Sequence, residues 1–219
     1  MTSQQQSTLD TILKQKMLPL YFNESKEVSI EVLKALYAAG IRTVEYTNRG
    51  AAALENFKAM VALRNESLEG LQLGIGTIKT VADAKAFLEA GADYIISPAL
   101  IPDVIKFTQG QGKLAVPGCL TPSEIVAAEQ LGVKFLKLFP GNLIGPGYVS
   151  AIKDLFPELY FMPTGGVDTT KESIKSWFDA GVVAVGMGSK LVSKERMQGQ
   201  DYAGIKKATE AVAAIIESI

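Results

Sequence analysis

Short apolar runs alternate with longer amphipathic stretches along the whole chain. The short runs are rich in β-branched and aromatic residues, whereas the longer stretches repeat apolar residues at helical spacing, as in Val28, Val32 and Leu36. This alternation is typical of βαβ units around a parallel sheet. Strands are predicted over residues 17–22, 42–46, 71–75, 94–96, 113–116, 135–138, 160–162 and 182–185.

A weak internal repeat indicates the number of these units. A glycine stands where a helix ends and a strand begins at Gly40, Gly91, Gly132 and Gly181. The spacings of 51, 41 and 49 residues fit two βα units per repeat and therefore eight strands. We predict one α/β domain over residues 1–219, a (β/α)8 TIM barrel, with residues 1–13 as a polar N-terminal segment or helix. An open doubly wound sheet is the structural alternative.

Composition excludes several classes of function. The chain has 22 Lys and Arg against 23 Asp and Glu, which argues against a nucleic-acid or membrane-surface partner. It has no His, so His-dependent nucleophiles, His-ligated zinc and imidazole catalysis are excluded. No apolar run is long enough to span a membrane. The single Cys, Cys119, is more typical of an apolar filler than of a nucleophile, and it favours a reducing, cytoplasmic location.

One lysine and one glutamate are the strongest candidates for chemistry. Lys137 lies in a run from Phe135 to Phe139 with no other polar residue, so we expect a buried amine; a surface lysine on an edge strand is the alternative. Burial favours the neutral, nucleophilic amine, which can form a Schiff base with a carbonyl substrate. Glu45 and Lys137 each stand five residues after a capping glycine. Because alternate barrel strands share interior layers, the two side chains are expected to face each other.

Two interpretations of Glu45 are open. A buried carboxylate is costly unless it is paired, so Glu45 could belong to a structural ion pair with Lys137 or Arg49. The functional interpretation is a general acid/base that serves the lysine, because carbinolamine formation, dehydration and carbon–carbon cleavage all move protons. With no His in the chain, a carboxylate is the natural proton carrier.

Further candidates lie where strands end, at the face on which barrel enzymes carry their active sites. Arg49, four residues after Glu45, is either a solvated charge or a clamp for a substrate carboxylate. The segment from Gly74 to Thr77 brings the Thr77 hydroxyl to the same rim, or it forms only a tight turn. Pro98 shapes the next rim loop or simply ends a strand.

The loops after the seventh and eighth strands carry the clearest signal for a ligand. Both are rich in glycine, and in (β/α)8 barrels these two loops commonly bind phosphate. Gly165 and Gly166 let backbone N–H groups approach an anion, and Ser189 adds a hydroxyl. Glycine turns without a ligand are the alternative. No P-loop sequence for a nucleoside triphosphate is present.

Six ordered motifs lie at residues 44–49, 74–77, 96–98, 116–118, 135–140 and 163–166. With these motifs, residues 18–192 resemble the class I, Schiff-base aldolases of the 2-keto-3-deoxy-6-phosphogluconate (KDPG) and 4-hydroxy-2-oxoglutarate aldolase family. By this resemblance Lys137 is the Schiff-base lysine and Glu45 the general acid/base. The carboxylate of pyruvate is held by Arg49, Thr77 and Pro98. The phosphate is bound by Gly165, Gly166 and Ser189.

The resemblance also implies an assembly and a reaction. Family members are homotrimers of (β/α)8 barrels and need no metal and no cofactor. We predict a lyase that cleaves KDPG to pyruvate and glyceraldehyde 3-phosphate, as in Entner–Doudoroff carbohydrate metabolism. The alternative substrates are 2-keto-3-deoxy-6-phosphogalactonate and 4-hydroxy-2-oxoglutarate, because residues 18–23 and 139–145 depart from the family's usual sequence at the rim.

Two other classes of protein are alternatives. A metal-dependent aldolase or phosphosugar isomerase would need carboxylate-rich metal ligands, and few acidic residues accompany Glu45 on the predicted strands. A non-catalytic phosphosugar-binding barrel would need the glycine loops, but it would not need a buried lysine opposite a glutamate.

Overall fold

Parallel strands form two sheets in the computed structural model, which describes residues 1–219. One sheet has six strands in the order β5-β4-β3-β2-β1-β9, and the other has three in the order β6-β7-β8. The strands are β1 Met17–Tyr21, β2 Thr43–Thr47, β3 Gln72–Gly76, β4 Tyr94–Ile96, β5 Leu114–Val116, β6 Gly118–Cys119, β7 Phe135–Leu138, β8 Tyr160–Pro163 and β9 Val185–Met187. The predicted parallel α/β fold is therefore confirmed.

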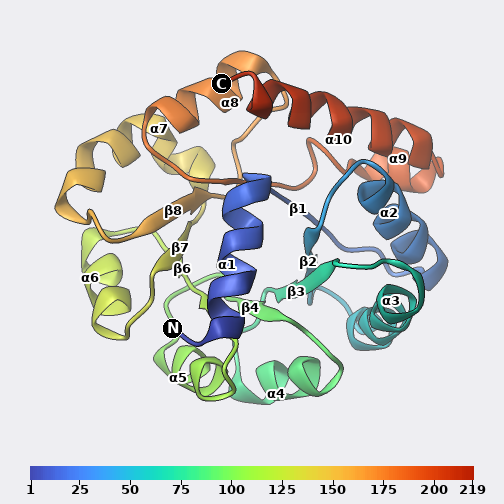
Figure 1. Cartoon of the computed structure of the whole chain (residues 1–219), viewed down its shortest axis with the longest axis horizontal. Coiled ribbons are helices and arrows are strands. Elements are labelled where there is room, and N and C mark those ends of the chain that lie inside the picture. The colour runs from blue at the N-terminus through green and yellow to red at the C-terminus, as the bar shows by residue number, and fades with distance from the viewer.

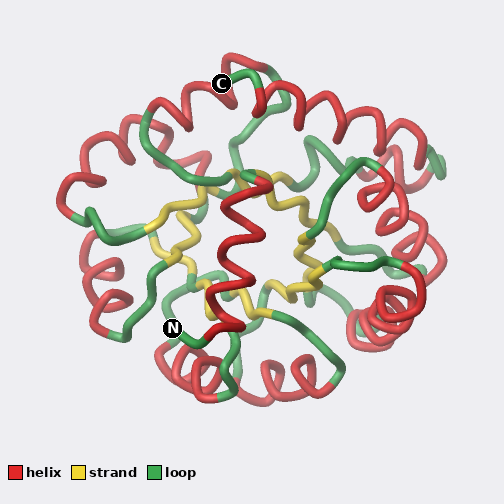
Figure 2. The backbone as a smooth tube through the Cα atoms, viewed as in Figure 1, coloured by secondary structure: helices red, strands yellow, loops and turns green.

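The helices surround the strands, except for the first one, which lies across the centre of the ring of strands (Figures 1 and 2). They are α1 Ser3–Gln15, α2 Lys26–Ala38, α3 Ala53–Ser67, α4 Val81–Glu89, α5 Pro102–Gly110, α6 Pro122–Gln130, α7 Gly141–Ile152, α8 Lys171–Asp179, α9 Lys194–Gln198 and α10 Tyr202–Glu217, with a short 3-10 helix at Lys153–Leu155. Most begin with a Ser, Thr or Asp whose side chain accepts a hydrogen bond from the first turn, as Thr121 does from Glu124. None is long and apolar enough to cross a membrane.

The two sheets meet at two places. Only Pro117 separates β5, which pairs with β4, from β6, which pairs with β7. At the other junction, Thr164 after β8 forms an isolated parallel bridge with Gly186 in β9. At this second junction the Val183 amide also donates to the Phe161 carbonyl of β8 at 3.1 Å. The strands are thus arranged around a common centre (Figure 2).

The sequence placed seven of the strands within one residue of their observed ends. There are two exceptions: the last strand, predicted over 182–185, begins at Val185, and the two-residue strand β6 is absent from the predicted set. Pairing with β1 starts where Met17 lies opposite Val185. Before that point the Val183 amide donates to Phe161 of β8, but no ladder with β1 has begun. The four capping glycines were identified correctly, because all have φ between +74° and +104°, a conformation that favours glycine.

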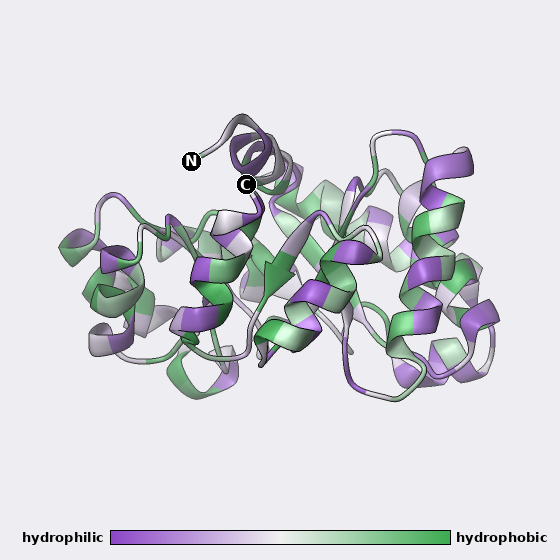
Figure 3. Cartoon of the chain, turned by 90° about the horizontal axis from the view of Figure 1, so that it is seen from below, coloured by the Kyte–Doolittle hydropathy of each residue, from purple (hydrophilic) through white to green (hydrophobic).

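The core has an outer part between strands and helices and a smaller inner part enclosed by the strands. The outer cluster contains 49 buried residues. The inner cluster consists of Leu9, Ile12, Leu18, Tyr94, Ile96, Leu114, Val116, Phe135, Met162 and Ala184. Since Leu9 and Ile12 belong to α1, this helix closes the amino ends of the strands, and Figure 3 shows it at one end of the molecule.

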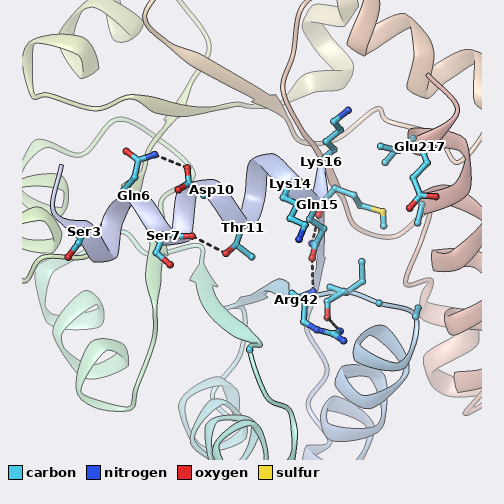
Figure 4. A pocket seen from close by; sticks show the side chains of 17 residues that line it. Ser3, Gln6, Ser7, Asp10, Thr11, Lys14, Gln15, Lys16, Arg42 and Glu217 are labelled. Atoms are coloured by element: carbon cyan, nitrogen blue, oxygen red, sulfur yellow. Dashed lines mark hydrogen bonds between the residues drawn. The ribbon is translucent and has the colours of Figure 1, made fainter.

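The side chain of Gln15 links α1 to the sheet by hydrogen bonds (Figure 4). Its Nε2 donates to the carbonyls of Met17 and Thr43, at 2.5 and 2.8 Å, and its Oε1 accepts from the amides of Arg42 and Thr43, at 2.6 and 3.0 Å. A hollow of about 940 Å³ lies beside α1, and Asp10, Lys14 and Glu217 are among the residues that line it (Figure 4). The carboxyl ends of the strands, where the predicted site lies, are at the opposite end.

Candidate active site

Lys137 and Glu45 meet inside the ring of strands. The Nζ atom of Lys137 lies 3.3 Å from Oε1 and 3.4 Å from Oε2 of Glu45. The side chains are 6% and 0% exposed, and the ammonium also lies 5.4 Å from the centroid of the Phe139 ring. β7 supplies the lysine and β2 the glutamate, so the pair links the two sheets. The expectation that these side chains face each other is confirmed.

The alternation of β7 directs Lys137 inward. Phe135 belongs to the inner cluster, while Leu136 and Leu138 belong to the outer one. Residues two apart on a strand share a face, so Lys137 points to the same side as Phe135. The alternative of a lysine exposed on an edge strand is wrong, because β7 lies between β6 and β8.

Two glycines of β3 make room for the interior side chains. Glu45 pairs with Gly74, and a Cβ on Gly76 would overlap the Glu45 carboxylate. A Cβ on Gly74 would overlap the ring of Tyr94. Both glycines lie within β3, so the alternative of a tight strand-to-helix turn is wrong for them. Their small size leaves space for the carboxylate to lie beside the lysine.

Arg49, Thr77 and Pro98 lie on the loops that follow β2, β3 and β4. The amide of Asn48 donates to the carbonyl of Gly76 at 2.9 Å, which places the residues before Arg49 and Thr77 side by side. Arg49 is exposed and takes part in none of the nine ion pairs of the chain, so the alternative of a Glu45–Arg49 pair is wrong. Its guanidinium is therefore available to an anion.

Thr77 has a strained backbone. Its φ is +64°, a left-handed conformation that a β-branched residue rarely adopts. Such strain costs about 1–3 kcal/mol and is common at ligand sites. Pro98 is half-buried, and its carbonyl lies so close to Gly118 that a Cβ there would overlap it. The backbone that carries the three rim residues is therefore held in place by contacts between neighbouring loops.

The loops after β8 and β9 offer free backbone donors. Gly165 and Gly166 have φ of +88° and +76°, and a Cβ on Gly166 would lie 2.6 Å from the Cα of Asn142. The amides of Gly165, Gly166 and Ser189 donate to no backbone acceptor in the chain. Unpaired N–H groups on closely packed glycines are suited to an anion such as phosphate.

Comparison with known proteins identifies the family to which this arrangement belongs. The family model described as "KDPG and KHG aldolase" matches residues 9–208. The chain belongs to this aldolase family. It is therefore a carbon–carbon lyase of the class I type, in which catalysis proceeds through a lysine Schiff base.

Relatives of the aldolase differ in the substrate for which they are named, and KHG/KDPG aldolases are among them. The chain is 34% identical over 153 residues to a 2-dehydro-3-deoxy-phosphogluconate aldolase of Treponema pallidum, covering 69% of this chain and 71% of that protein. It is also 34% identical over 145 residues to a 2-dehydro-3-deoxy-6-phosphogalactonate aldolase of Escherichia coli, covering 64% and 70%. A solved KDPG aldolase of Legionella pneumophila, with pyruvate captured as a covalent carbinolamine, is similar with a TM-score of 0.84 and 26% identity over 92% of this chain and 96% of that one.

The structure adds residues of the aldolase that sequence reasoning did not select. The Thr164 hydroxyl is buried without a hydrogen-bond partner, and a Cβ on Gly186 would overlap it. Asn142, at the start of α7, packs against the Gly165–Gly166 turn. Thr164 lies in the motif at residues 163–166, so the sequence alone could have indicated it as a site residue. Asn142 contacts a segment over 20 residues away in the sequence, so no local pattern could have predicted its place in the site.

Other titratable groups in the aldolase interior stay neutral. Burial raises the pKa of Tyr94 well above its usual range, and its hydroxyl contacts Thr43 at 2.8 Å and the carbonyl of Val44 at 3.0 Å. Burial, with a smaller effect of Glu124, raises the pKa of Cys119 to about 12. The expectation that Cys119 is an apolar filler is confirmed by its 1% exposure.

Proposed function

We propose that this aldolase cleaves KDPG to pyruvate and glyceraldehyde 3-phosphate through a Schiff base on Lys137. The observation that carries the proposal is the buried lysine with both carboxylate oxygens of Glu45 within 3.4 Å. This geometry supplies a nucleophile and a proton carrier to the same substrate atoms.

The first half of the reaction forms the imine. Proton transfer from the Lys137 ammonium to Glu45 leaves a neutral amine and a neutral carboxyl, a pairing that suits a buried site. The amine attacks the C2 carbonyl of the keto acid and gives a carbinolamine. The Glu45 carboxyl then protonates the departing hydroxyl, water leaves, and a protonated imine remains on Lys137.

The second half breaks the C3–C4 bond. The Glu45 carboxylate takes the proton of the C4 hydroxyl, the C3–C4 electrons move into the imine, and the aldehyde departs. Glu45 then returns a proton to C3 of the enamine. Water adds to the resulting imine, pyruvate is released, and Lys137 is regenerated as the amine.

The rim residues hold the two ends of the substrate. Arg49 and Thr77 bind the carboxylate of pyruvate, with Pro98 beside it, because a free guanidinium and a hydroxyl there can both donate to it. Gly165, Gly166 and Ser189 bind the phosphate, which their unpaired amides support. The galactonate-derived sugar acid and 4-hydroxy-2-oxoglutarate are the alternative substrates, and parallel turnover assays on all three decide among them.

Assembly and location complete the proposal. Only one residue separates β5 from β6, so these two count as one interrupted strand of the barrel. Together with the Thr164–Gly186 bridge, this supports one closed, eight-stranded (β/α)8 domain over residues 1–219. A homotrimer would cover apolar surface such as Leu143 and Leu155, which are 72% and 69% exposed. Light scattering measures its mass. A buried free thiol in Cys119 supports a cytoplasmic location, where pyruvate and the keto acid would be its small-molecule partners in an Entner–Doudoroff step.

Borohydride trapping tests the mechanism. With pyruvate and borohydride, peptide mass mapping should find a reduced pyruvate adduct on Lys137 in the wild-type chain and in the Lys134→Met control. Lys137→Met should give no adduct and no turnover. Absence of an adduct in the wild type, with activity abolished by a chelator, would establish the metal-dependent alternative. Binding of sugar phosphate without turnover would establish the non-catalytic barrel.

A further inference from the structure

An ion pair joins the two loops of the proposed phosphate site. Lys190 Nζ lies 3.1 Å from Oδ2 of Asp168. Asp168 belongs to the loop after β8, two residues beyond Gly166, and Lys190 directly follows Ser189 in the loop after β9. Two peptide units span at most about 7.6 Å, so Asp168 is close to the glycine turn. The pair thus lies beside the free amides already described.

Asp168 is a fixed anion. Its Oδ1 accepts from the amide of Thr169 at 2.7 Å, and its own amide donates to the Ser173 hydroxyl at 3.0 Å. Hydrogen bonding from Lys190, and then from the Thr169 amide, lowers the pKa of Asp168. A fixed carboxylate next to an anion site would repel a phosphate. A cation must therefore offset it if a phosphate is to bind there.

Lys190 is the movable partner. Its side chain is 65% exposed and that of Asp168 is 43% exposed. An ion pair this open to water contributes little to stability, so the ammonium can turn to another anion with little loss. A phosphate dianion attracts it more strongly than a single carboxylate does, because the attraction grows with charge.

We propose that Lys190 is a specificity-determining residue that leaves Asp168 and binds the terminal phosphate of the substrate, so that Asp168 is its partner only until the phosphate arrives. The inference rests on the proposed function and adds a cation to the backbone donors of Gly165, Gly166 and Ser189. Lys190 therefore favours phosphorylated sugar acids over 4-hydroxy-2-oxoglutarate, which has no phosphate and whose chain ends at C5.

Steady-state kinetics on two substrates tests the role of Lys190. For Lys190→Met, kcat/KM should fall about tenfold or more with the phosphorylated sugar acid, as expected for loss of a charge-assisted hydrogen bond. The same variant should change about twofold or less with 4-hydroxy-2-oxoglutarate. Lys190→Arg should restore most of the loss. Lys194→Met, an exposed lysine on α9 with no ion pair, is the matched control and should resemble the wild type on both substrates.

The Asp168→Asn variant distinguishes a role of Lys190 in binding phosphate from a purely structural role of the ion pair in holding the two loops together. It breaks the ion pair but keeps the ammonium, so KM for the phosphorylated substrate should not rise. Equal increases in KM for Asp168→Asn and Lys190→Met would overturn the proposal, because the pair would then only brace the two loops. Binding of inorganic phosphate, followed by ³¹P NMR, should weaken in Lys190→Met but not in Asp168→Asn.

Exchange of the pyruvate methyl protons with deuterium distinguishes failure of the proposed aldolase function from failure of the role given to Lys190. This exchange needs the enamine on Lys137 but no phosphate. A wild-type chain that neither exchanges pyruvate protons nor cleaves any of the keto acids would overturn the proposed function and this inference with it. Normal wild-type cleavage, with Lys190→Met equal to Lys194→Met, would overturn the inference alone.

Discussion

Removing one partner of the Lys137–Glu45 pair should destabilise the fold more than removing both charges. In Lys137→Met, the Glu45 carboxylate would remain buried with no other hydrogen-bond partner, because its only such bonds go to Lys137. Over 3.3 Å, at an effective dielectric constant of about 20, the lost Coulomb attraction is about 5 kcal/mol. Breaking a buried pair from one side typically costs about 3–5 kcal/mol.

The double variant Lys137→Met/Glu45→Gln carries no buried charge. We expect it to lie within about 1–2 kcal/mol of the wild type, since a buried ion pair gains little over a neutral replacement. Glu45→Gln alone leaves the ammonium unpaired and should be destabilised like Lys137→Met. The cycle of four proteins should therefore show a coupling free energy of about 6 kcal/mol, because each single variant loses about 4 kcal/mol while the double variant loses only about 1–2 kcal/mol.

Guanidinium unfolding measures this coupling. Trp177, the single tryptophan, is 2% exposed and reports the transition by fluorescence, with circular dichroism as a second probe at a fixed protein concentration. Lys134→Met is the control for loss of a nearby lysine. A Lys137→Met protein as stable as the wild type, or a double variant no more stable than either single one, would show that the two charges are not coupled in the folded state.

Three further predictions concern single residues. Arg49→Met should raise the pyruvate concentration needed for half-maximal deuterium exchange about tenfold or more, and Arg49→Lys should raise it less; no change would remove Arg49 from the site. Gly166→Ala should destabilise the chain and raise KM for the phosphorylated substrate, because φ is +76° and the new Cβ would meet Asn142, whereas Gly147→Ala, with open space around it, should be neutral in both measurements. The thiol of Cys119 has a pKa of about 12 in the folded state, so it ionises first in the unfolded chain and the unfolding free energy falls as pH rises above the unfolded thiol's pKa. Between pH 8 and 10 the wild type should lose about 2 kcal/mol more than Cys119→Ala. Equal losses in the two proteins would contradict this.

Local features of the sequence were enough to predict the order of the elements and the central pair. Strands and helices follow from hydrophobic spacing, and capping glycines mark where one gives way to the other. The register argument that joined Glu45 to Lys137 needed only the distance of each from its glycine. It succeeded because side chains alternate strictly along a strand, so an inward position on β2 and one on β7 can be counted.

Other features depend on contacts between distant segments. The last strand begins at Val185 because pairing with Met17 begins there, although the apolar run starts earlier. Gly76 is glycine because the Glu45 carboxylate occupies its side-chain space, whereas sequence alone allowed a turn. Nothing near Lys190 in the sequence predicts its pairing with Asp168.

The sequence by itself thus determined which residues lie inward on each strand and which follow the strand ends, since both depend on periodicity and local backbone preferences. Only the tertiary structure decided the contacts that the sequence left open: that Arg49 forms no ion pair with Glu45, that α1 closes the opposite end, and that the loops after β8 and β9 are joined by an ion pair. The physical reason is that close approach depends on how strands from different parts of the chain are brought together, and no local pattern encodes that distance.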